Sequence, residues 1–189
     1  GGDMNILTGI QATPGDKNPD AAGSSGGADN FKQKFSYMLA IEKPIFMAIN
    51  GPIAGIGLCF AVFGDFRYMA DGAKLTTAFA KRGLIAEHGI SWMLPRLIGT
   101  MNALDLLCSA RTVDAAEAER MGLVRKLPFE GFLAHVLHIA QEMTATASPR
   151  SIAVIKRQVW RTHFQSLAEA WGDADVEMKK SFASEDFKE

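Results

Sequence analysis

The feature that most constrains the fold is a short apolar run followed at once by a glycine-rich turn. Residues 45–49 form a continuous apolar stretch, which predicts a strand buried on both faces. The turn over residues 50–57 is rich in glycine, and the chain then becomes apolar on all sides over 58–63, which predicts a buried helix. Further strands are expected over 65–69 and 74–79. Strand, helix and strand therefore alternate as in a crossover unit of an α/β fold.

The rest of the chain is predicted to be mainly helical. Apolar spacing favours a helix over 31–41. Asp114, with a Glu three residues on, is expected to cap a helix that ends before Gly122, and Ser148 followed by proline is expected to begin another. Helical spacing continues over 167–182. The last third is thus a helical region suited to packing on the core or on a neighbouring subunit.

Two domains are expected, with an α/β core over residues 1–128 and a C-terminal helical region over 129–189. Residues 11–30 are dense in Gly, Ser, Pro, Asp and Asn, which predicts a mobile loop. A flexible lid and a disordered insertion are both open interpretations of this loop. Because the chain begins with Gly-Gly and stops within a charged helical pattern, we expect it to be a segment of something longer.

Composition and charge exclude several functional classes. The chain has 20 Lys plus Arg against 21 Asp plus Glu, so no large field favours nucleic acid or an anionic membrane. Cys59 and Cys108 form no Cys-x-x-Cys motif and lie in apolar surroundings, and no signal peptide or membrane span is evident. We expect a soluble, cytoplasmic protein. Phosphate-loop, dinucleotide and serine-esterase motifs are lacking, which leaves those chemistries unsupported.

The first candidate site is the turn that contains Gly55, Ile56 and Gly57. Glycine lets the backbone approach a ligand closely, and free N–H groups at a helix start can hold developing negative charge. These are the requirements of an oxyanion hole. The alternative is a turn that only lets a helix pack closely on a strand.

The second candidate is Glu87, with His88 beside it. Between Arg82 and Arg96 only these two residues can ionise, and their neighbours are apolar or small. Loss of water around a carboxylate raises its pKa toward the value that a general base needs near neutral pH. The alternative is a solvated surface residue, the usual state of an isolated Glu in a loop.

Metal binding is weakly supported. His135 and His138, at i and i+3, could share a metal, but no acidic or cysteine ligand lies nearby in the sequence. We therefore predict no metal and no resident cofactor.

A set of short segments forms a recognisable pattern: Lys43–Pro52 with Gly55, Gly57 and Asp65, then Leu97–Gly99, Ala115–Ala118, Met121–Val124 and Ser184–Phe187. In these segments the chain resembles the crotonase family, the enoyl-CoA hydratase/isomerase superfamily. The likeness covers nearly the whole chain, and the combination of its motifs is specific. The opening Gly1, Gly2 and Asp3 look like the tail of the family's Ala-Gly-x-Asp segment, which implies that the N-terminal part is missing from this chain.

The resemblance implies a spiral of repeated ββα units followed by a helical region that builds trimers or hexamers. It also implies an acyl-CoA thioester as substrate, with CoA as part of the substrate. The thioester oxygen would be held by two backbone N–H groups, one from Ile56 and one from the residue before Gly1. Gly1, Gly2, Asp3, Gly55 and Gly57 would line the substrate.

Family members differ in where they keep their catalytic carboxylates. Hydratases hold water between two glutamates, and the matching positions here are Cys59 and Phe79, which cannot do that job. Isomerases similar to the peroxisomal Δ3,Δ2-enoyl-CoA isomerases carry one glutamate in a Gly-Leu-Ile-x-Glu-Gly segment. The run from Gly83 to Glu87 matches it, with His88 where a glycine is usual.

Moving a double bond requires one base to take a proton at C2 and return it at C4, so a single carboxylate suffices. Double-bond isomerisation by Glu87, with His88 as an auxiliary group, is therefore the favoured hypothesis. Hydration or hydrolysis of an acyl-CoA by Glu87 and His88 is the nearest alternative. A non-catalytic acyl-CoA-binding or assembly subunit is the third.

Overall fold

Two three-stranded sheets form the centre of the molecule in the structure, a computed structural model that describes residues 30–187. In one sheet β3 lies between β1 and β6, and all three strands are parallel. In the other, β4 pairs parallel with β2 and antiparallel with β5. The strands are β1 (Phe46–Ile49), β2 (Ile53–Ala54), β3 (Phe66–Ala70), β4 (Lys74–Thr76), β5 (Val113–Asp114) and β6 (Arg125–Leu127).

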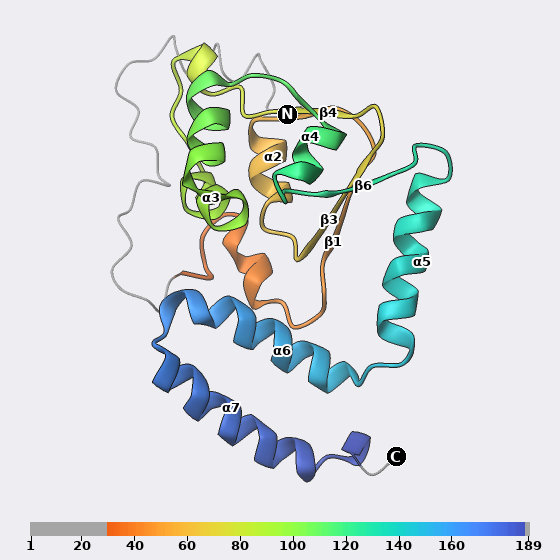
Figure 1. The fold of residues 1–189 in the computed structure, drawn as a ribbon. Coiled ribbons are helices and arrows are strands. Elements are labelled where there is room, and N and C mark those ends of the chain that lie inside the picture. Colours follow the sequence, from red (N-terminus) through yellow and green to blue (C-terminus); the bar gives the residue numbers. More distant parts are fainter. Residues whose placement is uncertain (1–29, 188–189) are drawn as a thin grey trace.

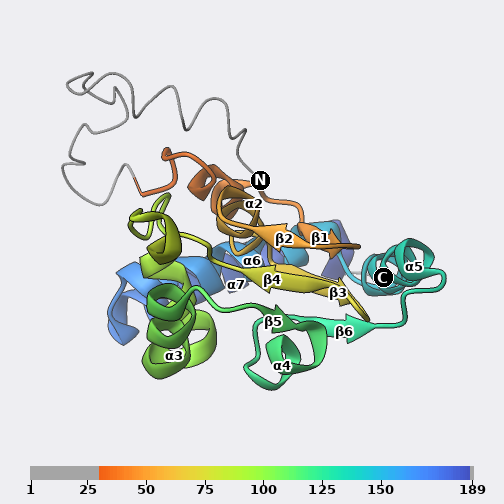
Figure 2. The same ribbon diagram turned by 90° about the horizontal axis from the view of Figure 1, so that it is seen from above.

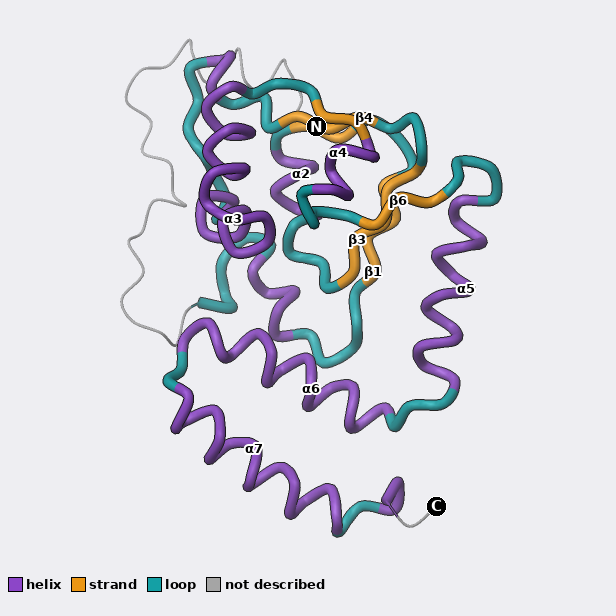
Figure 3. Tube along the Cα trace, in the orientation of Figure 1, coloured by secondary structure: helices purple, strands orange, loops and turns teal. Residues whose placement is uncertain are grey.

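Helices cover these sheets and continue beyond them, as Figures 1 and 3 show. The α-helices are α2 (Ile56–Ala61), α3 (Ile90–Ser109), α4 (Ala115–Arg120), α5 (Phe132–Ala145), α6 (Pro149–Arg161) and α7 (Leu167–Phe182). The 3-10 helices are η2 (Ser36–Ala40), η3 (Ala80–Arg82), η4 (Thr162–Phe164) and η5 (Glu185–Phe187). The order β1-β2-α2 and then β3-β4-α3 gives two successive ββα turns, as predicted.

The two turns stack because their strands are apolar enough to be buried. Tyr68, Met69 and Ala70 of β3 are at most 2% exposed, and Phe46 of β1 stacks on Phe66 of β3 at a ring-centroid distance of 4.8 Å. Seen from above, α2 and α4 lie on opposite sides of the strands (Figure 2). This arrangement fixes the start of α2, where the predicted glycine turn lies.

Most predicted elements are confirmed, one strand is shorter than expected and one helix is wrong. The expected strands at 45–49 and 65–69 appear as β1 and β3, whereas β4 ends at Thr76. The predicted helix over 31–41 is wrong, since only Ser36–Ala40 is helical and as a 3-10 helix. Phe35 just before it has φ 72° and ψ −33°, which no α-helix can accommodate.

The predicted helix caps are confirmed. The Asp114 side chain accepts a hydrogen bond from the Glu117 N–H at 2.7 Å, and the Ser148 side chain accepts one from the Ser151 N–H at 3.1 Å. Gly122 follows α4 with φ 82°. The Glu117 side chain binds Arg111 at 2.6 Å, and this bond lowers the pKa of the Glu117 carboxyl group.

A buried ion pair joins α6 to the sheet region. Lys156 Nζ lies 2.7 Å from Asp65 Oδ2 and donates to the carbonyl oxygens of Met38 and Lys43. Asp65 also accepts hydrogen bonds from the Trp160 indole N–H and from the backbone N–H of Ile45, just before β1. Lys156 is 8% exposed, so α6 is held by a charged contact rather than by apolar packing alone.

Some predictions lie outside the described residues. These are the mobile loop up to residue 29 and the substrate-binding roles of Gly1, Gly2 and Asp3. The division of the chain at residue 128 stays a prediction. Among residues 30–187 no helix has the length and apolar character that crossing a bilayer requires.

Candidate active site

The glycine turn opens α2 as predicted. Gly55 has φ 52° and ψ −121°, a conformation that glycine tolerates and side-chain-bearing residues rarely adopt. Its N–H donates to the Thr76 carbonyl at 3.3 Å, and the first α2 hydrogen bond runs from the Cys59 N–H to the Gly55 carbonyl at 3.0 Å. The N–H groups of Ile56 and Gly57 precede that bond, so the helix ladder does not use them. The role of the Ile56 N–H as an oxyanion donor stays a prediction.

Glu87 lies in the irregular loop between η3 and α3. Its side chain is 35% exposed, and that of His88 is 20% exposed. The apolar neighbour Ile85 is 78% exposed, so the residues next to Glu87 in sequence do not provide the shielding we expected. The Glu87 side chain is therefore partly open to solvent.

His88 approaches Glu87 closely. His88 Nε2 lies 3.4 Å from Glu87 Oε2, a favourable charge contact when the imidazole is protonated. His88 has φ 52°, in the left-handed region that glycine occupies most easily. The usual glycine at this position therefore has a conformational reason, and this chain accepts strain to place an imidazole there.

Helix α2 packs against the same loop. Cys59 Sγ donates a weak hydrogen bond to the Glu87 carbonyl at 3.6 Å, and Gly89 sits where an added Cβ would lie 3.1 Å from the Phe63 ring. The loop carrying Glu87 and His88 is thus held on the helix whose first N–H groups form the turn. The loop that carries one candidate thus packs against the helix that begins at the other.

Cys59 cannot act as a base near neutral pH. Burial, and secondly the nearby Glu87 carboxylate, raise the pKa of its thiol to about 12. Phe79, the other position matching a hydratase glutamate, is 4% exposed and has no ionisable group. Of these three positions, Glu87 alone carries a carboxylate.

Sequence reasoning missed two features around the site. The Phe35 ring lies 5.6 Å from the His88 ring at an interplanar angle of 73°, and Lys34 is close enough to lower the pKa of Cys59 slightly. Both residues fall in the segment predicted as a regular helix, where nothing marked them out. The positive φ at Phe35, which the sequence does not reveal, interrupts that helix.

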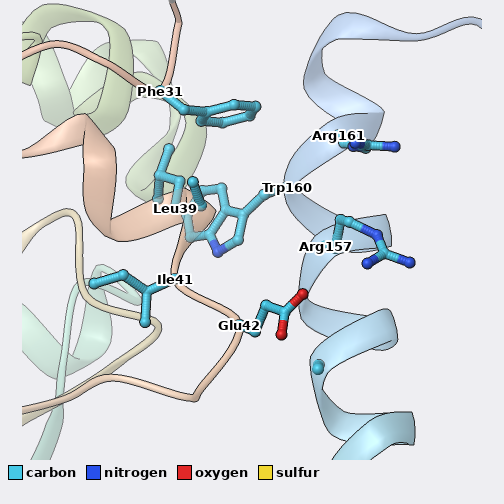
Figure 4. A pocket seen from close by; sticks show the side chains of 9 residues that line it. Phe31, Leu39, Ile41, Glu42, Arg157, Trp160 and Arg161 are labelled. Carbon is cyan, nitrogen blue, oxygen red and sulfur yellow. The ribbon is translucent and has the colours of Figure 1, made fainter.

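A cavity of about 130 Å³ lies between η2 and α6 (Figure 4). Its lining residues are Phe31, Leu39, Ala40, Ile41, Glu42, Ala153, Arg157, Trp160 and Arg161. Glu87 is not among them, so this cavity is separate from the candidate site.

The two histidines of α5, His135 and His138, do not belong to a cluster of metal-binding residues among those described. His138 Nε2 lies 3.4 Å from Glu142 Oε1 on the same helix, and both side chains are more than half exposed. Within the part of the chain that the structure describes, no group of three or more His, Cys, Asp or Glu residues could hold a metal ion.

Several known proteins are similar to this chain. A probable enoyl-CoA hydratase of Mycobacterium tuberculosis is 39% identical over 122 residues, which are 64% of this chain and 42% of that protein. This chain therefore spans less than half the length of that relative.

Two solved structures are also similar. A monofunctional enoyl CoA isomerase from M. smegmatis has a TM-score of 0.65 and 37% identity, covering 72% of this chain and 64% of its own. An enoyl-CoA hydratase from Polaromonas sp. JS666 has a TM-score of 0.80 and 23% identity, covering 95% of this chain and 68% of its own, which shows a shared fold. The predicted crotonase-like fold class is confirmed.

The family profile described as enoyl-CoA hydratase/isomerase matches residues 15–189, nearly the whole chain. The protein therefore belongs to the enoyl-CoA hydratase/isomerase family.

Proposed function

We propose that the protein moves a double bond within an acyl-CoA thioester, with Glu87 as the only catalytic acid/base. The observation that carries this proposal is the composition of the site around α2. Glu87 is held against that helix, while Cys59 and Phe79 occupy the positions where hydratases carry glutamates. One carboxylate is enough for a proton shuttle, whereas water addition needs a group that positions the nucleophile as well.

The proposed reaction converts a 3-enoyl-CoA into a 2-enoyl-CoA. The Glu87 carboxylate takes a proton from C2, and the electron pair moves into the thioester, whose oxygen becomes negative. The Ile56 N–H donates to that oxygen, and a second donor is expected from the residue before Gly1. The Glu87 carboxylic acid then returns the proton at C4, which leaves the double bond at C2. This chemistry needs no cofactor beyond the CoA carried by the substrate.

A second candidate function is hydration of a 2-enoyl-CoA or hydrolysis of an acyl-CoA. The 3.4 Å approach of His88 to Glu87 favours it, because two adjacent groups could together position and deprotonate water. The relative from M. tuberculosis is named as a probable hydratase, and the one from M. smegmatis as an isomerase. Isomerisation is preferred because, of Glu87, Cys59 and Phe79, all within residues 30–187, Glu87 alone carries a carboxylate.

The test is turnover of a 3-enoyl-CoA and a 2-enoyl-CoA by the native protein and by Glu87→Gln. We expect the native protein to prefer the 3-enoyl substrate, and Glu87→Gln to lose turnover by a factor of about 10³ or more. Glu130→Gln makes the same change at an exposed position at the start of α5 and should leave turnover unchanged.

Full activity of Glu87→Gln would contradict the proposal. Preference for the 2-enoyl substrate would favour hydration, and binding of the thioester without any product would favour a non-catalytic binding or assembly subunit.

Assembly is part of the proposal. The exposed apolar residues of α6 and α7, among them Ile155 at 57% and Trp171 at 67%, would be covered in a trimer or hexamer. We place the protein in the cytoplasm, where its two cysteines, both free in the structure, would stay reduced.

A further inference from the structure

Two residues with unfavourable backbone conformations meet beside the Glu87 carboxylate. Within residues 30–187, the non-glycine residues with positive φ are Phe35 (72°), Ala78 (62°), His88 (52°) and Ala110 (45°). Phe35 and His88 are in contact, with ring centroids 5.6 Å apart. A bulky residue at positive φ is strained, and such strain persists only where the surroundings impose it, most often at functional sites.

The surroundings of Phe35 hold its ring from several sides. The Phe60 ring of α2 packs edge-on against it at 5.5 Å, and Lys34 Nζ lies 5.6 Å from its centroid. The η2 helix that follows Phe35 is anchored in turn, because the Met38 carbonyl accepts a hydrogen bond from the buried Lys156. The ring is therefore fixed relative to α2 and to the α6 ion pair.

The His88 side chain links Phe35 to the Glu87 carboxylate. The His88 imidazole touches Phe35 at a ring centroid distance of 5.6 Å, and its Nε2 lies 3.4 Å from Glu87 Oε2. An imidazole with no aromatic neighbour could turn away from Glu87 and into solvent. Contact with the Phe35 ring favours the orientation in which the two site residues meet.

We propose that Phe35 is a positioning residue, whose ring fixes the His88 imidazole against Glu87 and so sets the direction of the carboxylate. The inference rests on the proposed function of Glu87. It adds that strain at Phe35 and at His88 is retained because it places these two rings together.

The experiment compares Phe35→Leu and Phe35→Tyr in the full-length protein. Leucine is no easier to place at positive φ than phenylalanine, so the first change removes the ring without relieving the backbone. Tyrosine keeps the ring. Phe31→Leu is the matched control, because Phe31 belongs to the same segment, is also partly buried and makes a similar edge contact at 5.7 Å, but to Phe164.

With a 3-enoyl-CoA as substrate, we expect Phe35→Leu to lower kcat about tenfold and to leave KM within about twofold, because the proton acceptor is misdirected while the thioester still binds. Phe35→Tyr and Phe31→Leu should keep native kcat. The imidazole resonances of His88 in an NMR spectrum should shift in Phe35→Leu and keep their native positions in Phe31→Leu. Circular dichroism verifies the fold, and Phe35→Met replaces Phe35→Leu if the latter does not fold.

The inference is overturned if Phe35→Leu keeps native kcat, if Phe31→Leu loses as much, or if tyrosine fails to restore the rate. Failure of the proposed function looks different, because Glu87→Gln would then turn over normally. In that case the His88 resonances still report whether Phe35 orients the imidazole.

Discussion

The sheet region and the C-terminal helices use their apolar residues differently. The part of the chain from Met38 to Val124 supplies nearly all of the buried apolar core, including Leu58, Leu75 and Leu94 at 2% exposure or less. Helix α7 has no buried residue, and α6 buries only Lys156. The C-terminal helices nevertheless carry regular apolar spacing. Periodicity thus indicates where a helix forms, but not whether this chain alone covers its apolar face.

Local signals explain why the C-terminal helices form without a core of their own. Ser166 and Glu169 make a reciprocal capping box at the start of α7, in which the Ser166 N–H donates to Glu169 Oε2 at 2.7 Å. That hydrogen bond lowers the pKa of the Glu169 carboxyl group. At the start of α6, Pro149 occupies the first turn behind the Ser148 cap. The starts of α6 and α7 are thus determined by residues at or next to each boundary.

The largest expected effect lies where the two regions join. Lys156→Met leaves the buried Asp65 carboxylate without its partner and should lower the free energy of unfolding by about 3–5 kcal/mol. Urea denaturation measures this. Lys179→Met, an exposed change on α7, should cost less than about 0.5 kcal/mol. Equal stability of the two variants would show that α6 is held by apolar packing alone.

The same substitution in each region sharpens the comparison. Leu75→Ala removes a side chain that is 1% exposed and should cost about 3 kcal/mol through lost burial and a cavity. Leu167→Ala changes a residue that is 80% exposed and should cost less than about 0.5 kcal/mol in dilute solution. If Leu167→Ala destabilises as strongly, and more so at high protein concentration, another subunit covers α7.

At neutral pH the smallest effect concerns the two cysteines. Burial raises the pKa of Cys59 to about 12 from an ordinary value of 9.0, so the unfolded thiol ionises first as the pH rises. This thiol therefore contributes stability that is complete below pH 9.0 and is lost between pH 9.0 and about 12.

In the folded protein at pH 8, iodoacetamide followed by mass spectrometry should modify the exposed Cys108 and spare Cys59. Rapid alkylation of Cys59 would mean that α2 opens easily.

The sequence predicted the fold where local pattern and burial agree. The apolar run of β1, the glycine turn and the caps at Asp114 and Ser148 all follow from side-chain chemistry at or near each position. The helix predicted over 31–41 failed because Phe35 adopts a positive φ, which tertiary contacts with Phe60 and His88 impose.

The candidate site was predictable in its residues but not in its surroundings. The run from Gly83 to Glu87 and the turn at Ile56 could be found from motifs. The packing of the Glu87 loop could not, because it depends on Cys59 of α2 and on Phe63, just after that helix, meeting the loop across more than twenty residues of sequence. Apolar neighbours in sequence suggested a shielded Glu87, yet Ile85 points into solvent. Shielding is a property of the fold and not of adjacent residues.

The most direct test of the proposed mechanism is a structure of the full-length protein with an unreactive CoA thioester bound. The mechanism predicts a Glu87 carboxylate oxygen within hydrogen-bonding reach of C2 and the Ile56 N–H directed at the thioester oxygen. A different carboxylate at C2, or a Glu87 side chain turned into bulk solvent while the thioester is bound, would contradict it.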